Sequence, residues 1–142
     1  MACGAALVAP EPAREARKVV TVVFADITGS TGLGERLDPE TMRSIMGRWF
    51  EAMRVVLERH DGSVEKFIGD AVVAVFGVPV VHEDDALRAV RTAAEMSDAL
   101  AILNRELEAG WGVQLGHRIG INTGEVITGD HSGPRFTTGE AV

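Results

Sequence analysis

The sequence predicts an α+β fold, in which two long helices cover a sheet, from the kind and order of its periodic segments. Two segments, 39–60 and 82–110, carry apolar residues at helical spacing, which is typical of helices that pack on a sheet. Four others are rich in β-branched residues or alternate apolar with polar ones. They cover residues 19–28, 63–68, 71–77 and 115–130. The resulting order is β-α-β-β-α-β, that of the ferredoxin-like sandwich.

Length and composition are those of one globular domain. A chain of 142 residues can bury roughly two thirds of its unfolded surface, and 46% hydrophobic with 25% charged residues lies far from the disordered range. The net charge is −7, and no cluster of Lys and Arg occurs. Because a duplex-DNA binder carries a basic stripe, we expect no nucleic-acid partner.

The N-terminal segment indicates neither export nor a membrane span. The single cysteine, Cys3, forms no internal disulfide, and the opening MACGAALVAPEP lacks the basic start of a signal peptide and the length of a transmembrane helix. We therefore expect a cytoplasmic protein. Pro10, Pro12 and the charged run to Lys18 indicate a flexible segment over 1–18, followed by the folded domain over 19–142.

The first strand is expected at VVTVVFADIT, residues 19–28. GSTGLGERL then indicates a glycine-rich turn into a short helix, which Ser30 or Thr31 is expected to cap. Asp38 as N-cap and Pro39 in the first turn begin a long helix, since proline there gives up only an N–H that has no partner. The residues expected on its buried face are Met42, Ile45, Met46, Trp49, Phe50, Met53, Val56 and Leu57.

A hairpin and a second long helix follow. GSVEKFIGDAVVAVFG, residues 62–77, places the turn Gly69-Asp70 between two apolar runs. HEDD at 82–85 begins the helix, whose inward face is expected to consist of Leu87, Val90, Ala94, Leu100, Leu103 and Leu107. In LGHRIGINTGEVITGD, residues 115–130, Gly124 predicts a bulge or turn between one strand and a further one.

This order of elements places two aspartates together. The first and third strands are expected to be antiparallel neighbours, so Asp26 and Asp70 fall at the same edge of the sheet. Two such carboxylates repel each other unless they share a proton or bind a divalent cation. The glycine-rich ADITGSTG offers backbone N–H groups that suit phosphate oxygens. The pattern therefore favours a metal-nucleotide site, although the G-x-x-x-x-G-K of a P-loop is missing.

Each of these residues also has a purely structural interpretation. Asp70 in a Gly-Asp pair is a common turn residue, and a strand-terminal aspartate such as Asp26 is often a cap. Lys66 beside Glu65 is typical of a solvated side chain on a strand. Arg118 either meets phosphate or points outward from its strand. The residues alone leave these alternatives open.

Four motifs resemble, in order and spacing, the class III nucleotidyl cyclase catalytic domain of the bacterial type. They are FADITGSTGLGERLDPE, VEKFIGDAVVAVFGVP, HEDDALRAV and RIGINTGEV, and the resemblance runs from about Val20 to Val142. It implies the nucleotide cyclase fold, incomplete here at its C-terminus. It also implies conversion of ATP, or alternatively GTP, to the 3′,5′-cyclic nucleotide and pyrophosphate for intracellular signalling.

The resemblance further implies roles for individual residues. Asp26 and Asp70, with the carbonyl of Ile27, match the ligands of two Mg²⁺ or Mn²⁺ ions per site. Lys66 matches the residue that reads the purine. The active sites of the family lie between two head-to-tail chains, which implies a homodimer or a heterodimer with a complete cyclase chain. The residues that match the phosphate cradle are Thr28, Gly29, Ser30, Thr31 and Gly32.

The sequence departs from the family in two places. The second base-reading position falls on Phe136, which cannot hydrogen-bond a base edge, and Thr137 replaces it only if the register slips by one. The family's ribose-orienting Asn and transition-state Arg fall beyond Val142, so the chain alone is expected to be weakly active or inactive. It is expected to be a fragment of a longer cyclase, or a chain that lends its metal site to a complete partner.

Two other classes of function compete with this interpretation. The first is a non-catalytic module that binds a nucleotide or effector and regulates by dimerisation. The second is a purely structural ferredoxin-like domain, which binds nothing. Metal-dependent nucleotide binding that requires Asp26 and Asp70 distinguishes the cyclase from both.

Overall fold

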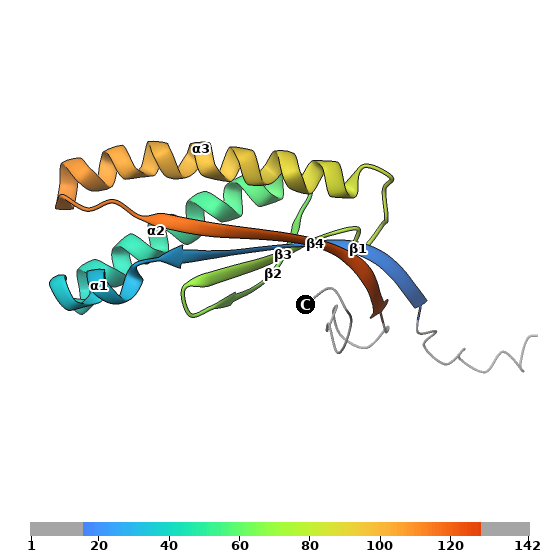
Figure 1. The fold of residues 1–142 in the computed structure, drawn as a ribbon, viewed down its shortest axis with the longest axis horizontal. Coiled ribbons are helices and arrows are strands. Elements are labelled where there is room, and N and C mark those ends of the chain that lie inside the picture. The colour runs from blue at the N-terminus through green and yellow to red at the C-terminus, as the bar shows by residue number, and fades with distance from the viewer. Residues whose placement is uncertain (1–15, 129–142) are drawn as a thin grey trace, which may run out of the picture.

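The computed structural model describes residues 16–128, without the side chains of Ala16, residues 66–68 and Thr128. Its elements in chain order are β1 (Ala16–Thr28), α1 (Ser30–Arg36), α2 (Pro39–Arg59), β2 (Ser63–Ile68), β3 (Ala71–Phe76), α3 (Asp85–Trp111) and β4 (Gly116–Thr128). Figure 1 shows α2 and α3 lying on one side of the sheet. No helix within residues 16–128 is both long and apolar enough to cross a bilayer. The predicted α+β fold is confirmed.

The strands form one sheet of order β2-β3-β1-β4, and every neighbouring pair is antiparallel. This is the sheet expected from a β-α-β-β-α-β order. β1 is a central strand, on which Asp26 lies opposite Ala71 of β3 and Arg118 of β4. It begins at Ala16 instead of residue 19, because its ladder with β4 continues to Thr128.

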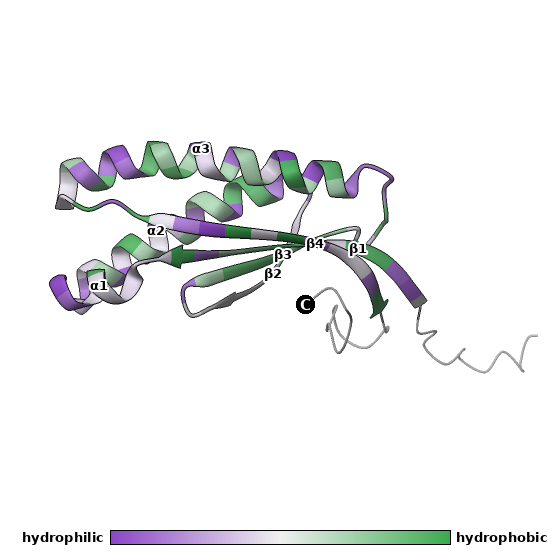
Figure 2. Ribbon diagram, viewed as in Figure 1, coloured by the Kyte–Doolittle hydropathy of each residue, from purple (hydrophilic) through white to green (hydrophobic). Residues whose placement is uncertain are grey.

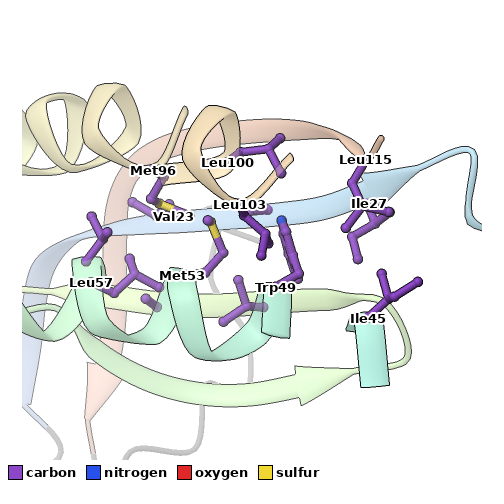
Figure 3. Packing of buried hydrophobic residues seen from close by; sticks show 14 of the residues in the cluster. Val23, Ile27, Ile45, Trp49, Met53, Leu57, Met96, Leu100, Leu103 and Leu115 are labelled. Atoms are coloured by element: carbon purple, nitrogen blue, oxygen red, sulfur yellow. The ribbon is translucent and has the colours of Figure 1, made fainter. Parts of the chain in front are cut away.

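The main core lies between the two long helices and one face of the sheet. Ile45, Trp49 and Met53 of α2 are fully buried. Figure 3 shows Trp49 and Met53 near Leu103 and Met96 of α3, and Ile45 near Ile27 of β1. Figure 2 shows hydrophobic and hydrophilic residues mixed along both β4 and α3. Burial of this apolar surface is the main contribution to the stability of the domain.

α2 begins as the sequence predicts. The Asp38 carboxylate accepts the backbone N–H of Thr41 at 3.0 Å and its hydroxyl at 2.6 Å, and Pro39 occupies the first turn. These contacts satisfy groups that a helix start leaves without intrahelical partners. The predicted inward face is confirmed, with five residues buried and three half-buried. The buried ones are Ile45, Trp49, Met53, Val56 and Leu57, and the half-buried ones are Met42, Met46 and Phe50.

The predicted inward face of α3 is correct only in its second half. Leu100, Leu103 and Leu107 are buried, but Leu87 and Val90 are 51% and 54% exposed and Ala94 is exposed as well. The N-terminal half instead buries Asp85, Ala89, Thr92 and Met96. The spacing from Met96 to Leu107 fixes which side of the helix faces the sheet. Leu87 lies two residues from Ala89, about 200° around the helix, and therefore points to solvent.

The turn predicted at Gly124 is absent from β4. The strand runs unbroken from Gly116 to Thr128, and its pairing with β1 keeps one register throughout, with Gly124 opposite Val20. A glycine in a strand costs only about 0.5–1 kcal/mol, which the continuous ladder offsets. The irregularity lies in β2, where the register shifts between Val64 and Lys66.

Candidate functional site

Asp26 and Asp70 lie at the same edge of the sheet. Asp26 pairs with Ala71, the residue that follows Asp70, and the backbone N–H of Ile27 donates to the carbonyl oxygen of Asp70 at 3.0 Å. Both contacts exist because β1 and β3 are antiparallel neighbours, which places the end of β1 beside the β2–β3 turn. The structure therefore brings the two aspartates together, as the order of elements predicts.

The hydroxyl of Ser30 contacts the carboxylate of Asp70. Ser30 is the first residue of α1, and its Oγ donates to Asp70 Oδ2 at 2.7 Å. The prediction that Ser30 or Thr31 caps α1 is wrong, because Gly29 occupies the cap position with a left-handed φ of 74° and no side chain caps the helix. The hydroxyl acts as a donor to a charged acceptor, which makes a stronger hydrogen bond than a neutral partner does.

The predicted phosphate cradle, residues 28–32, connects β1 to α1 directly beside the aspartates. Thr31 and Gly32 are exposed in the first turn of α1, where backbone N–H groups have no intrahelical partners. Thr28 is half-buried and closely approached by Gly116 of β4. A Cβ added at Gly116 would lie 2.5 Å from the Thr28 hydroxyl oxygen, so a larger residue there would force the Thr28 side chain to move.

Arg118 of β4 makes a two-pronged ion pair with Asp26. Its Nε donates to Oδ1 at 3.2 Å and its Nη2 to Oδ2 at 2.9 Å. The β1–β4 register places the two residues opposite each other. The Arg118 side chain is 75% exposed and that of Asp26 is 19% exposed, so the pair forms at the surface of the site. Neither interpretation that the sequence leaves open for Arg118 includes this contact.

The charge of Arg118 is coupled to both aspartates. The pKa of its guanidinium lies above the ordinary value, first because of the hydrogen bonds to Asp26 and then because of the charge of that carboxylate. The charge of Asp70 contributes in the same direction. Since a guanidinium stays protonated at any physiological pH, a fixed positive charge lies next to the two carboxylates.

His117 precedes Arg118 but faces the helices. Its Nδ1 accepts the Trp49 Nε1–H at 3.4 Å, and its Nε2 lies 3.4 Å from the Ser97 hydroxyl. Burial lowers the pKa of His117, which favours the neutral imidazole. His117 pairs with Ile27 in the ladder and supports the strand on the side away from the aspartates.

The side chains expected to read the base lie outside the described residues. Lys66 lies in β2 with its backbone paired to Val73, and its side chain is outside the described residues. Phe136 and Thr137 also lie outside the described range. Their proposed contacts with a purine therefore stay predictions.

The oxygen donors at this edge fit a divalent cation such as Mg²⁺ or Mn²⁺. These hard ions bind carboxylate and carbonyl oxygens, which Asp26, Asp70 and Ile27 can supply. Within residues 16–128, no three His, Cys, Asp or Glu side chains gather around one point. The acidic contribution is therefore two carboxylates, which suits Mg²⁺ sites that complete their coordination with phosphate and water oxygens.

A hollow of about 580 Å³ adjoins the β2–β3 turn. It is bordered by Gly69 and lined by Met42, Met46 and Phe50 of α2, and it includes neither aspartate. Asp26 and Asp70 instead lie at the end of β1 and in the β2–β3 turn, where both are partly exposed.

Sequence comparison relates the chain to one family. The family model described as "Adenylate and Guanylate cyclase catalytic domain" matches residues 13–137. Adenylate cyclase 1 of Rhizobium meliloti (strain 1021) is 31% identical over 113 residues, which cover 80% of this chain and 17% of that protein. The chain therefore spans only a small part of the length of this curated relative.

Solved cyclase structures have the same fold. The adenylyl cyclase CyaB from P. aeruginosa is 31% identical with a TM-score of 0.78, over 84% of this chain and 63% of that chain. The guanylyl cyclase Cya2 is 34% identical with a TM-score of 0.78, over 90% of this chain and 65% of that one.

Proposed function

The chain belongs to the adenylate and guanylate cyclase catalytic domain family, and from that premise we propose that it converts ATP or GTP to the 3′,5′-cyclic nucleotide and pyrophosphate. The observation that carries the proposal is the pair Asp26 and Asp70, which meet at one edge of the sheet beside the turn into α1. When the ribose 3′-oxygen attacks the α-phosphorus, the negative charge on the attacking and leaving oxygens must be neutralised. Divalent cations can neutralise this charge, and a pair of carboxylates can hold such cations.

Two Mg²⁺ or Mn²⁺ ions would be held by Asp26, Asp70 and the carbonyl of Ile27. When bound, such ions favour deprotonation of the 3′-hydroxyl and neutralise the triphosphate as pyrophosphate leaves. The chain orients the ligands: Ser30 donates to Oδ2 of Asp70, and the N–H of Ile27 donates to the Asp70 carbonyl. Asp70 is thus held at two atoms, which limits the rearrangement that binding requires.

The nucleotide would extend from the phosphate cradle toward β2. Residues 28–32 would receive the phosphates, and Arg118 is close enough to the aspartates to reach the same anion. Lys66 would read the purine edge, with Thr137 as the candidate for a second contact. A lysine ammonium can donate to adenine N1 or to guanine O6, so Lys66 does not by itself select the base. The similar proteins include both an adenylyl and a guanylyl cyclase by name.

The complete site would lie between two head-to-tail chains, either two copies of this one or this chain with a complete cyclase chain. In support, both aspartates are partly exposed where β1 ends beside the β2–β3 turn, outside the nearby hollow. In the second case, the groups that orient the ribose and stabilise the transition-state phosphate would come from the complete cyclase chain. The product would act as a signal in the cytoplasm.

Production of cyclic AMP and cyclic GMP with Mn²⁺ tests this proposal. The chain is assayed alone and mixed with a complete domain of the same family whose metal aspartates are substituted. We expect activity in the mixture, its loss with Asp26→Ala or Asp70→Ala, and its retention with Asp98→Ala, an exposed position on α3. Nucleotide binding without turnover in every mixture would instead indicate a regulatory binding module.

A further inference from the structure

The two carboxylates of the site have different partners. Both oxygens of Asp26 accept from the guanidinium of Arg118, at 3.2 and 2.9 Å. Asp70 accepts at Oδ2 from the neutral hydroxyl of Ser30, at 2.7 Å. A neutral hydroxyl leaves the charge of Asp70 in place for a cation, whereas the guanidinium already neutralises that of Asp26.

Arg118 is the more exposed member of its pair. Its side chain is 75% exposed, against 19% for Asp26. Alternate residues of a strand share a face, so its nearest neighbours on the same face of β4 are Gly116 and Gly120, which have no side chains to hold the guanidinium in position. The guanidinium can therefore leave Asp26 without disturbing the core.

We propose that Arg118 competes with a divalent ion for the carboxylate of Asp26. The inference rests on the proposed function, because it concerns the same aspartates. A divalent ion that binds Asp26 displaces the guanidinium, and the displaced guanidinium lies next to the position proposed for the nucleotide phosphates. Arg118 is thus a positioning residue, which weakens metal binding in the absence of nucleotide.

The competition also couples the binding of metal to the binding of nucleotide. A nucleotide that attracts the displaced Arg118 removes the competitor, so it raises the affinity for metal, and the metal raises the affinity for nucleotide by the same factor. The size of the competition follows from the exposure of the pair. Exposed ion pairs are weak, so removal of Arg118 is expected to tighten nucleotide-free metal binding about two- to fivefold.

Titration of the full 142-residue chain with Mn²⁺ alone, followed by the electron paramagnetic resonance signal of the free ion, tests the proposal. The first variant, Arg118→Gln, removes both the positive charge and the two-pronged guanidinium. The second, Arg118→Lys, keeps the charge but cannot bind both carboxylate oxygens as a guanidinium does. Arg105→Gln on α3 is the matched control, since it removes the same charge at an exposed position away from the site. Circular dichroism checks that each variant is folded.

We expect Arg118→Gln to tighten Mn²⁺ binding about two- to fivefold, Arg118→Lys to tighten it less, and Arg105→Gln to leave it unchanged. Unchanged or weaker binding with Arg118→Gln overturns the proposal. An Arg118→Lys variant that binds Mn²⁺ with the same affinity as the unsubstituted chain also overturns the proposal. A positive charge near the site would then account for the result without the two hydrogen bonds to Asp26. If the folded, unsubstituted chain binds no Mn²⁺, the metal site of the proposed function fails and this inference fails with it.

Discussion

Ser30 contacts an aspartate that lies 40 positions further along the chain, and this contact fixes the geometry of the β2–β3 turn. Its hydroxyl holds one oxygen of Asp70, while the backbone N–H of Ile27 holds the carbonyl of the same residue. Two donors from the end of β1 and the start of α1 therefore set the direction of the carboxylate. Preorganised ligands of this kind reduce the cost of ordering when a metal binds.

The substitution Ser30→Ala removes one of these two donors. A hydrogen bond to a charged group contributes about 1 kcal/mol or more, so we expect Mn²⁺ affinity to fall about fivefold. Ser44→Ala, at an exposed position on α2, is the matched loss of a hydroxyl and should have no effect. Isothermal titration measures both. Equal affinities for the two variants would show that the Ser30 contact does not orient the ligand.

His117 makes the stability of the domain dependent on pH. Burial lowers the pKa of His117, so below the usual value of about 6.5 the unfolded chain binds a proton that the folded chain resists. Stability is therefore complete above about pH 6.5 and decreases as the pH falls from there toward the lowered pKa of the folded state. The proton would also displace the Trp49 Nε1–H from Nδ1.

Urea unfolding at pH 5.5 and 7.5 measures this effect. The variant His117→Asn keeps an acceptor for Trp49 but does not titrate, so we expect it to lose less stability at the lower pH than the unsubstituted chain. His82→Asn is the control, since His82 is exposed on the loop before α3. An acid sensitivity that His117→Asn leaves unchanged would assign the effect to another group.

The helix α3 is the element whose predicted buried face differs most from the one in the structure. Leu107 is fully buried, whereas Leu87 on the same helix is 51% exposed. Leu107→Ala should therefore destabilise the domain by about 2–5 kcal/mol, because it leaves a cavity. Leu87→Ala should change stability by no more than about 0.5 kcal/mol. Chemical denaturation compares the pair, and equal losses would contradict the orientation of the helix.

The sequence predicts elements well where local signals are specific. Asp38 and Pro39 mark the start of α2, because both residues act on the first turn alone. The cap accepts one of its N–H groups, and proline gives up an N–H that has no partner there. The orientation of α3 has no such cause. Its N-terminal half carries two apolar stripes, one with Leu87 and one with Ala89, and packing against the sheet selects between them. Gly124 fails as a turn signal because the ladder with β1 is favourable along the whole of β4.

In the candidate site, too, some features could be predicted from the sequence and others could not. Asp26 and Asp70 are predicted to be neighbours, because the order of elements fixes which strands are adjacent. The contacts of Arg118 and Ser30 depend on the strand register and on the angle at which α1 leaves Gly29. Neither the register nor this angle can be predicted from the local sequence. The signal that could have found the Arg118 pair is an arginine and an aspartate of opposite charge on adjacent antiparallel strands.

For the whole molecule, the layer arrangement bears on where the proposed second chain would bind. The long helices cover one side of the sheet (Figure 1). Phe24 is 42% exposed and lies two residues before Asp26, on the same side of β1. A partner that completes the proposed site would therefore contact Phe24.

Phe24→Glu is expected to shift the chain toward monomer, because it places a charge in the proposed contact. Val90→Glu is the matched control, since Val90 is 54% exposed on α3, in the helical layer. Sedimentation equilibrium measures both variants. Association that Val90→Glu weakens and Phe24→Glu does not would place the contact on the helices and contradict the proposed dimer.

We propose that Asp26 and Asp70 together hold the metal of a metal-nucleotide site. The most direct measurement is calorimetric binding of a non-hydrolysable ATP analogue, and of its GTP counterpart, with Mn²⁺ and with EDTA. We expect binding that EDTA abolishes, that Asp26→Asn and Asp70→Asn each remove, and that Asp98→Asn leaves intact. Binding that persists in EDTA, or in both folded site variants at unchanged affinity, would contradict the claim.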